Sequence, residues 1–222
     1  MKRIGAIIFA PIVFLIIGYS LIYVIGQPVI QFVTSSLDLF LLNDAPKFDE
    51  TSETAFAAVK DEDVKTDADN ELPSSEINYP RGGEKYGKIV IDDLKIDEPL
   101  YFGDTQAILR YGAGQYMGSV YPGELGTTLV GGHNTASFGK LLGIETGTTV
   151  KVQTTYANYT YKVVSREIKY KTDQDIQAQI VQQKKRHLIL YTCYPLNSLG
   201  MSDRRVFVTC EFVDGPIIND AK

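Results

Sequence analysis

The feature that most constrains this chain is an uncharged run close to its N-terminus. Residues 4–33 contain no Asp, Glu, Lys, Arg or His. The first 22 of them, residues 4–25, are mostly apolar. A helix of that length would extend about 33 Å, and the hydrocarbon core of a bilayer is about 30 Å thick. The run therefore predicts a transmembrane helix over residues 4–25.

The charges that flank this run predict its orientation. Lys2 and Arg3 precede it, and the next basic residue is Lys47. Because Lys and Arg are enriched on the cytoplasmic side, we expect residues 1–3 in the cytoplasm and the rest outside. A cleaved secretory signal is the alternative, but its apolar stretch usually has about 7–15 residues before a small-residue cleavage site. The longer run favours an uncleaved anchor, and thus a single-pass protein of the cell membrane.

An acidic segment separates the apolar run from the rest of the chain. Residues 43–76 contain 11 acidic side chains against three lysines and few large apolar residues. Like charges repel one another and extend a chain, so we interpret residues 26–76 as a spacer that holds a domain away from the membrane. A specific acidic binding site is the alternative.

Residues 77–222 have the composition of a folded domain. They contain 17 basic and 15 acidic residues, and the whole chain has fewer Lys and Arg (22) than Asp and Glu (27). This balance argues against nucleic acid as a partner. Short β-rich segments alternate with glycine-rich turns, which predicts a mainly β domain, a closed barrel or sandwich with short helices. The expected strands are 87–93, 96–101, 128–131, 148–152, 158–170, 187–192 and 205–212, and the expected helices are 104–110 and 173–182.

Three side chains at strand ends could carry chemistry. His133 follows an apolar strand in the run Val-Gly-Gly-His-Asn, and Cys193 leaves another in Leu-Tyr-Thr-Cys-Tyr-Pro. Arg205 opens the next strand, directly after Arg204. A cysteine nucleophile needs a thiolate, which a nearby imidazolium or guanidinium favours, and an arginine can stabilise an oxyanion. The alternative is that Cys193 is a small buried apolar residue and His133 a surface or core histidine.

The remaining His and Cys are weaker candidates. His187 ends the basic run that begins at Lys184, so we expect it in a solvated loop. Cys210 lies five residues after Arg205; because strand side chains alternate, it is expected on the opposite face, in the core. Neither C-x-x-C nor H-x-x-x-H spacing occurs, which argues against a metal site. Glu124, Asp173 and Asp175 could bind calcium between loops, but we favour solvated turn residues.

The order of these motifs resembles the sortases, membrane-anchored cysteine transpeptidases of Gram-positive bacteria. Residues 91–103 resemble the first strand pair of that family, and residues 111–128 the stretch before its catalytic histidine. Gly132-His133-Asn134 resembles the G-H-N/R signature, and Thr192-Cys193 the end of the TLxTC signature. Arg205, followed by Val-Phe-Val, resembles the arginine of the last strand.

The resemblance implies an eight-stranded sortase β-barrel with His133, Cys193 and Arg205 as the catalytic residues. Cys193 would attack the threonine carbonyl of an LPxTG-like sorting signal on a surface protein and form a thioacyl intermediate. His133 would protonate the departing amine, and Arg205 would hold the peptide and the oxyanion, together with the backbone N–H of Tyr194. A cell-wall precursor amine would accept the acyl group. No cofactor is implied, although a calcium requirement stays open.

Cys-Tyr-Pro and the 12-residue step from Cys193 to Arg205 resemble class D most. The expectation that no second transmembrane segment occurs argues against most pilus-building members. An extracellular cysteine peptidase that uses water as acceptor is a second hypothesis, and an anchored β-domain that only binds partners is a third. An L,D-transpeptidase would need a Ser-His-Gly-Cys run, which residues 190–193 do not supply.

Overall fold

The structure, a computed structural model, describes residues 13–16, 18–20, 58–60, 64, 66, 70–196 and 202–219. The chain divides into one compact unit of residues 1–45 and 197–201 and a second of residues 46–196 and 202–222. In the first unit, residues 13–16 and 18–20 are helical. Among the described residues, no helix combines the length and the apolar character that crossing a membrane requires. Most of the expected 4–25 helix lies outside the described residues.

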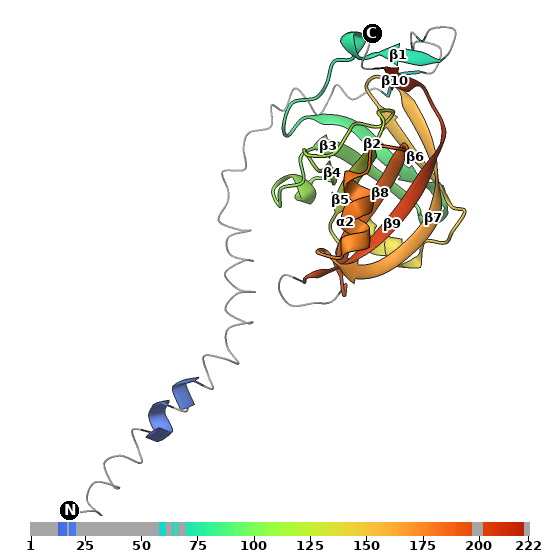
Figure 1. Cartoon of the computed structure of the whole chain (residues 1–222). Coiled ribbons are helices and arrows are strands. Elements are labelled where there is room, and N and C mark those ends of the chain that lie inside the picture. Colours follow the sequence, from blue (N-terminus) through green and yellow to red (C-terminus); the bar gives the residue numbers. More distant parts are fainter. Residues whose placement is uncertain are drawn as a thin grey trace, which may run out of the picture. The chain divides into compact units, whose positions relative to one another are not determined.

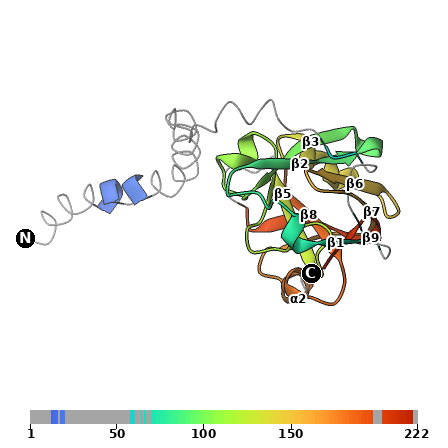
Figure 2. The same ribbon diagram turned by 90° about the horizontal axis from the view of Figure 1, so that it is seen from above.

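The second unit is built around a closed β-barrel, as Figure 1 shows. Its eight strands follow one another around the barrel in the order β2-β3-β4-β5-β8-β9-β7-β6. Seen from above, they surround a common interior (Figure 2). This architecture confirms the expected mainly β fold with eight strands in a closed barrel. The strands are β2 (Lys85–Ile91), β3 (Ile96–Phe102), β4 (Ala113–Gln115), β5 (Thr127–Gly132), β6 (Thr149–Thr154), β7 (Asn158–Tyr170), β8 (His187–Tyr194) and β9 (Arg204–Asp214).

Alternation along the strands separates an inner face from an outer one. On β8, Leu188 and Leu190 belong to the central core. Ile189, between them, belongs to a second cluster with Phe207 of β9. Both clusters are buried, so residues 188–190 of β8 are all apolar and do not alternate between apolar and polar side chains. An element on the outside must therefore cover the outer face.

That element is helix α2 (Gln174–Val181), which lies between β7 and β8 in the sequence. Its Ile176 is fully buried against Ile189 and Phe207, and Leu129 of β5 completes the cluster. Residues 173–182 were expected as a helix, and this is confirmed with Asp173 as the N-cap. The expected helix over 104–110 is instead a turn followed by the 3₁₀ helix η5 (Ile108–Arg110).

Two short strands outside the barrel extend the folded unit toward the N-terminus. β1 (Glu71–Pro73) pairs in parallel with β10 (Ile217–Asn219), and Asn219 Nδ2 donates to Glu71 Oε2 at 2.7 Å. Leu72 of β1 is 4% exposed and joins the central core. A 3₁₀ helix, η3 (Ser74–Glu76), follows β1. The folded unit thus begins before residue 77, within the segment interpreted as spacer.

Contacts of the spacer with the barrel reach back still further. The Val59 N–H donates to the Thr154 carbonyl at 3.3 Å, and Asn158 Nδ2 donates to the Val59 carbonyl at 2.9 Å. Val64 packs against the central core. Val59 and Val64 therefore contact the barrel, although the sequence around them is acidic.

We predict that a chain starting at residue 77 unfolds at a lower temperature than a chain starting at residue 58. The shorter chain lacks β1 and the buried Leu72 side chain. Removing a buried leucine side chain costs about 2–5 kcal/mol, so Leu72→Ala in the longer chain should account for much of the difference. Thermal melts measure both effects.

The matched control is Leu125→Ala, since the Leu125 side chain is 47% exposed. Exposed substitutions usually change stability by less than about 0.5 kcal/mol. Coincident melts for the two chain lengths would show that β1 contributes nothing to the barrel.

Candidate functional site

Cys193 and Arg205 lie directly opposite each other on neighbouring antiparallel strands. Their Cα atoms are register partners near the end of β8 and the start of β9. Side chains of directly opposed residues point to the same face, with Cβ atoms about 4.5–5.5 Å apart. This is the outer face. Residues two apart on a strand share a face, so Cys193 lies on the same face as Tyr191 and Ile189, and Arg205 on the same face as Phe207. Both side chains are partly exposed.

His133 reaches the same place from β5. β5 and β8 pair in parallel, and the last register pair is Gly132 with Thr192. His133 follows the first of these residues and Cys193 the second, so the two side chains leave adjacent strands at the same level. The Thr192 hydroxyl donates to the Gly132 carbonyl at 2.8 Å and fixes this level. The strand register thus places the three predicted residues at neighbouring positions on β8, at the start of β9 and just after β5.

Asn134 ties the histidine turn to the segment that follows the cysteine. Its Nδ2 lies 3.3 Å from the carbonyl oxygens of both Pro195 and Leu196. Asn134 was predicted only as part of the Gly-His-Asn motif, and the sequence around it does not indicate these long-range bonds. They hold the turns after β5 and β8 against each other, which keeps His133 and Cys193 in fixed relation.

The surroundings of His133 favour its neutral form. Burial lowers the pKa of the imidazole below its usual value, and the positive charge of Arg110 lowers this pKa further. Arg110 ends η5, so the segment after β3 also faces the histidine. Arg110 was not among the predicted site residues, because its proximity to His133 depends on the fold of the segment after β3.

The Arg205 guanidinium is oriented by the backbone. Its Nη1 donates to the carbonyls of Ser202 and of Arg204, the latter at 2.9 Å. Lys171 Nζ pairs with Asp203 Oδ1 at 2.9 Å, which connects the end of β7 to the residues before Arg205. Arg204 is exposed, and its guanidinium lies 5.4 Å from the Tyr194 ring centroid and 5.9 Å from that of Tyr170.

A groove of about 330 Å³ extends over the outer face from Arg205. Leu129, Ile180 and Phe207 contribute apolar surface to it, and most of its other side chains are polar or charged. This composition suits an extended peptide, whose side chains need apolar contacts and whose backbone needs hydrogen bonds. The groove is lined by Asp104, Tyr116, Leu129, Lys171, Gln177, Ile180, Tyr191, Arg205 and Phe207.

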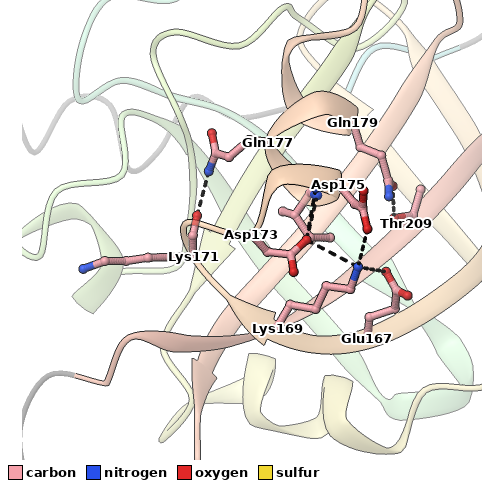
Figure 3. A network of polar contacts seen from close by, with 9 residues as sticks. Glu167, Lys169, Lys171, Asp173, Asp175, Gln177, Gln179 and Thr209 are labelled. Carbon is pink, nitrogen blue, oxygen red and sulfur yellow. Dashed lines mark hydrogen bonds and ion pairs between the residues drawn. The ribbon is translucent and has the colours of Figure 1, made fainter.

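A cluster of charged side chains fixes the start of α2 (Figure 3). Gln177 and Ile180 of this helix line the groove. Lys169 Nζ lies 3.4 Å from Asp173 Oδ1, 3.4 Å from Asp175 Oδ2 and 3.8 Å from Glu167 Oε2. The Asp173 carboxylate also accepts the N–H groups of Asp175 and Ile176, at 3.1 and 3.3 Å. This is the geometry of an N-cap.

We predict that Asp173→Ala lowers the melting temperature by a few degrees and loosens α2. Partial desolvation raises the pKa of the Asp173 carboxyl, but the bonds from the Ile176 N–H and the Lys169 ammonium outweigh it and hold this pKa below its usual value. A carboxyl with a lowered pKa stabilises the fold above its unfolded pKa of about 3.9, and this contribution disappears as the pH falls through the folded value. The difference in melting temperature between Asp173→Ala and the unmodified chain should therefore become smaller at acid pH.

Asp175→Asn is the control, because the Asp175 side chain is 83% exposed and contacts only the lysine end of the cluster. It should melt close to the unmodified chain. Equal losses from the two substitutions would refute a capping role for Asp173.

The second cysteine and the second histidine lie elsewhere. Cys210 is fully buried on the inner face of β9, as expected, and burial raises the pKa of its thiol far above the usual value. His187 was expected in a solvated loop; instead it opens β8 and is half-buried, and its two ring nitrogens make no hydrogen bond within the described part of the chain. It lies six residues from Cys193, at the other end of the strand.

The acidic residues considered for calcium have protein partners. Glu124 accepts the Tyr79 hydroxyl at 2.9 Å and the Tyr121 N–H at 2.7 Å. Asp173 and Asp175 contact Lys169. Among the described residues, no group of three or more His, Cys, Asp or Glu side chains is arranged to hold a metal ion.

Comparison with known proteins supplies relatives for this geometry. The sortase-domain family model matches residues 89–213, a range that includes the histidine, cysteine and arginine described above. Sortase D of Bacillus subtilis (strain 168) is 30% identical over 129 residues, which are 58% of this chain and 64% of the relative. The chain thus matches less than two thirds of that relative's length.

Solved structures show the same architecture. Sortase C of Clostridium perfringens SM101 is 25% identical, with a TM-score of 0.52 over 60% of this chain and 72% of that one. A second structure, Clostridium perfringens sortase C with the C-terminal cell wall sorting motif, is 24% identical, with a TM-score of 0.53 over 60% and 73% of the two chains. The latter likeness is evidence of the fold.

Proposed function

Because this chain belongs to the sortase family, we propose that it is a membrane-anchored cysteine transpeptidase. Its donor substrates are surface proteins with an LPxTG-like sorting signal, and its acceptor is a cell-wall amine. The observation that carries the proposal is the register of β5, β8 and β9, in which Cys193 opposes Arg205 and follows the partner of Gly132. The similarity to sortase D supports class D.

The proposed reaction has two steps. The Cys193 thiolate attacks the threonine carbonyl of the sorting signal, and a carbon–sulfur bond forms while the Thr–Gly amide bond breaks. His133 gives a proton to the departing glycine amine. An incoming amine then attacks the thioester and loses a proton to His133, and the thiolate is released. A new amide bond replaces the old one, so the two-step reaction needs no cofactor and no oxidant.

Arg205 is suited to stabilise the oxyanion that develops on the threonine carbonyl. Two backbone carbonyls hold its guanidinium on the face that carries Cys193, and a charge fixed in advance costs no reorganisation during the reaction. The backbone N–H of Tyr194 is a candidate second donor. Partial burial and the positive charge of Arg110 lower the pKa of His133, so the proton that His133 gives to the departing amine is one that it takes from the Cys193 thiol as the thiolate forms.

The anchor and the location belong to the same proposal. The uncharged run over residues 4–25 follows Lys2 and Arg3, so we infer a single membrane pass with the barrel on the extracellular side. A sorting signal on an exported protein would then meet the groove outside the cell. The Clostridium perfringens sortase C structure with the C-terminal cell wall sorting motif supports this substrate class for the present chain.

Mass spectrometry tests the proposal directly. The barrel is incubated with an LPxTG-type peptide, and the intact protein is then weighed and digested. We expect a mass increase equal to the acyl part of the peptide, located on Cys193. Addition of an amine should release it as a new amide.

Release of free acid alone, even at high amine concentration, would favour the second hypothesis, an extracellular cysteine peptidase with water as acceptor. A barrel that forms no adduct with any such peptide and does not react with thiol reagents would favour a domain that only binds partners.

A further inference from the structure

A tyrosine and an aspartate 87 positions apart meet in the groove beside Cys193. The Tyr191 hydroxyl donates to Asp104 Oδ2 at 3.0 Å. Tyr191 precedes Cys193 by two residues on the same face of β8, and Asp104 follows the end of β3. Both side chains line the groove together with Arg205.

Two glycines make the path for this contact. Gly131 of β5 is the register partner of Tyr191, and a Cβ atom at Gly131 would lie 2.5 Å from Tyr191 Cζ. Gly114 of β4 is the next register partner across the sheet, and a Cβ atom there would lie 3.0 Å from Asp104 Cα. A larger residue at either of these two positions would collide with the tyrosine ring or with the backbone near Asp104. The two glycines therefore leave the space in which the Tyr191 hydroxyl reaches Asp104.

The Tyr191 ring is held on several sides. Gly131 lies beneath it, and the Phe207 ring lies beside it, with centroids 6.2 Å apart and planes inclined by 34°. Burial and the Asp104 carboxylate raise the pKa of the hydroxyl well above its usual value, so it keeps its proton and remains a donor. A buried hydroxyl that donates to a carboxylate makes one of the stronger hydrogen bonds in a protein.

We propose that Tyr191 forms the floor on which the apolar residues of the sorting signal lie, and that Asp104 is the positioning residue that fixes this floor. The inference rests on the proposed function. β8 ends one residue after Cys193, so the continuous outer face extends from the cysteine back toward Tyr191. Two strand residues span about 7 Å, which is within reach of the residues that precede the scissile threonine.

The side chains around the ring match that occupant. Leu129, Ile180 and Phe207 surround the floor with apolar surface, which suits the leucine and proline of an LPxTG-like signal. Without the hydroxyl or the carboxylate, the Tyr191 ring would still be present, but the hydrogen bond to Asp104 would no longer fix its position. Binding of the signal should weaken, whereas the thiol chemistry of Cys193 should not change.

A double-mutant cycle tests this coupling. Tyr191→Phe and Asp104→Ala should each lower kcat/KM for acylation by an LPxTG peptide about tenfold, in KM rather than in kcat. The double variant should lose about tenfold as well, not the hundredfold of independent effects. Asp104→Asn keeps an acceptor oxygen and should retain most of the activity. Tyr170→Phe, on an exposed ring of β7, should change nothing.

Alkylation of Cys193 by iodoacetamide gives the second readout, and its rate should stay within about twofold in every variant. Multiplicative losses in the double variant, or unchanged KM in both single variants, would overturn the inference while leaving the proposed function intact. Alkylation that falls in parallel with acylation would also overturn it, because the pair would then act on the thiol. If the unmodified chain forms no adduct, the proposed function fails and this inference with it.

Discussion

Cys193→Ala should abolish the thioacyl adduct and all turnover of a sorting-signal peptide, whereas Cys210→Ser should retain both. Alanine has no atom that can attack a carbonyl, and no other described cysteine is exposed, since Cys210 is fully buried on the inner face of the barrel. The barrel should keep its melting temperature in the Cys193 variant, because that side chain is partly exposed and alanine removes a single atom from it.

Intact-protein mass spectrometry after incubation with the peptide is the measurement. Cys210→Ser places a hydroxyl in an apolar core, so modest destabilisation is expected there without loss of the adduct. An adduct that survives in the Cys193 variant and disappears in the Cys210 variant would move the nucleophile to the core and invalidate the assignment.

Arg205→Ala should lower the rate of acyl-enzyme formation by about 10²–10³, roughly 3–4 kcal/mol of transition-state stabilisation. Arg205 is the register partner of Cys193, and its guanidinium is fixed by carbonyls of Ser202 and Arg204. Arg205→Lys should restore little, because an ammonium lacks the planar fork that bonds two groups at once. Single-turnover acylation measures the effect.

Arg204→Ala is the matched control, since it removes the same charge from the adjacent position. Arg204 is exposed and lies over the rings of Tyr170 and Tyr194. Its loss should cost some stability through those ring contacts and little of the acylation rate. A larger rate loss at 204 than at 205 would reverse the two assignments.

The barrel was predictable because its long strands have a recognisable residue pattern. Residues 158–170 and 205–212 combine β-branched and aromatic residues with turn residues at both ends, and both lie within strands of the structure. The helix over residues 173–182 was also predictable, whereas its position over the outer face of the barrel was not. The three site residues could be identified because each follows or opens such a strand, in the order typical of the family.

The elements that escaped prediction are short and depend on distant partners. β1 contains one large apolar residue, Leu72, within an acidic segment, and becomes a strand only because β10 lies beside it. β4 is three residues long with a glycine at its centre, so its sequence carries no strand pattern. The contacts of Asp104 with Tyr191 and of Asn134 with Pro195 and Leu196 join residues far apart in the sequence, and local patterns contain no information about them.

The parallel pairing of β1 with β10 makes the barrel suited to circular permutation. Because the two strands are parallel, Asn219 lies beside Pro73, and a linker that joins Asn219 to Glu71 must run back along the pair. β9 runs from Arg204 beside the groove to Asp214, just before β10 (Figure 1). At about 3.3 Å per residue this separates the pairing from the groove by about 30 Å. New ends could then be opened at the exposed turn near Lys184, and a cargo protein inserted in the linker beside β10 would leave the groove clear for peptides.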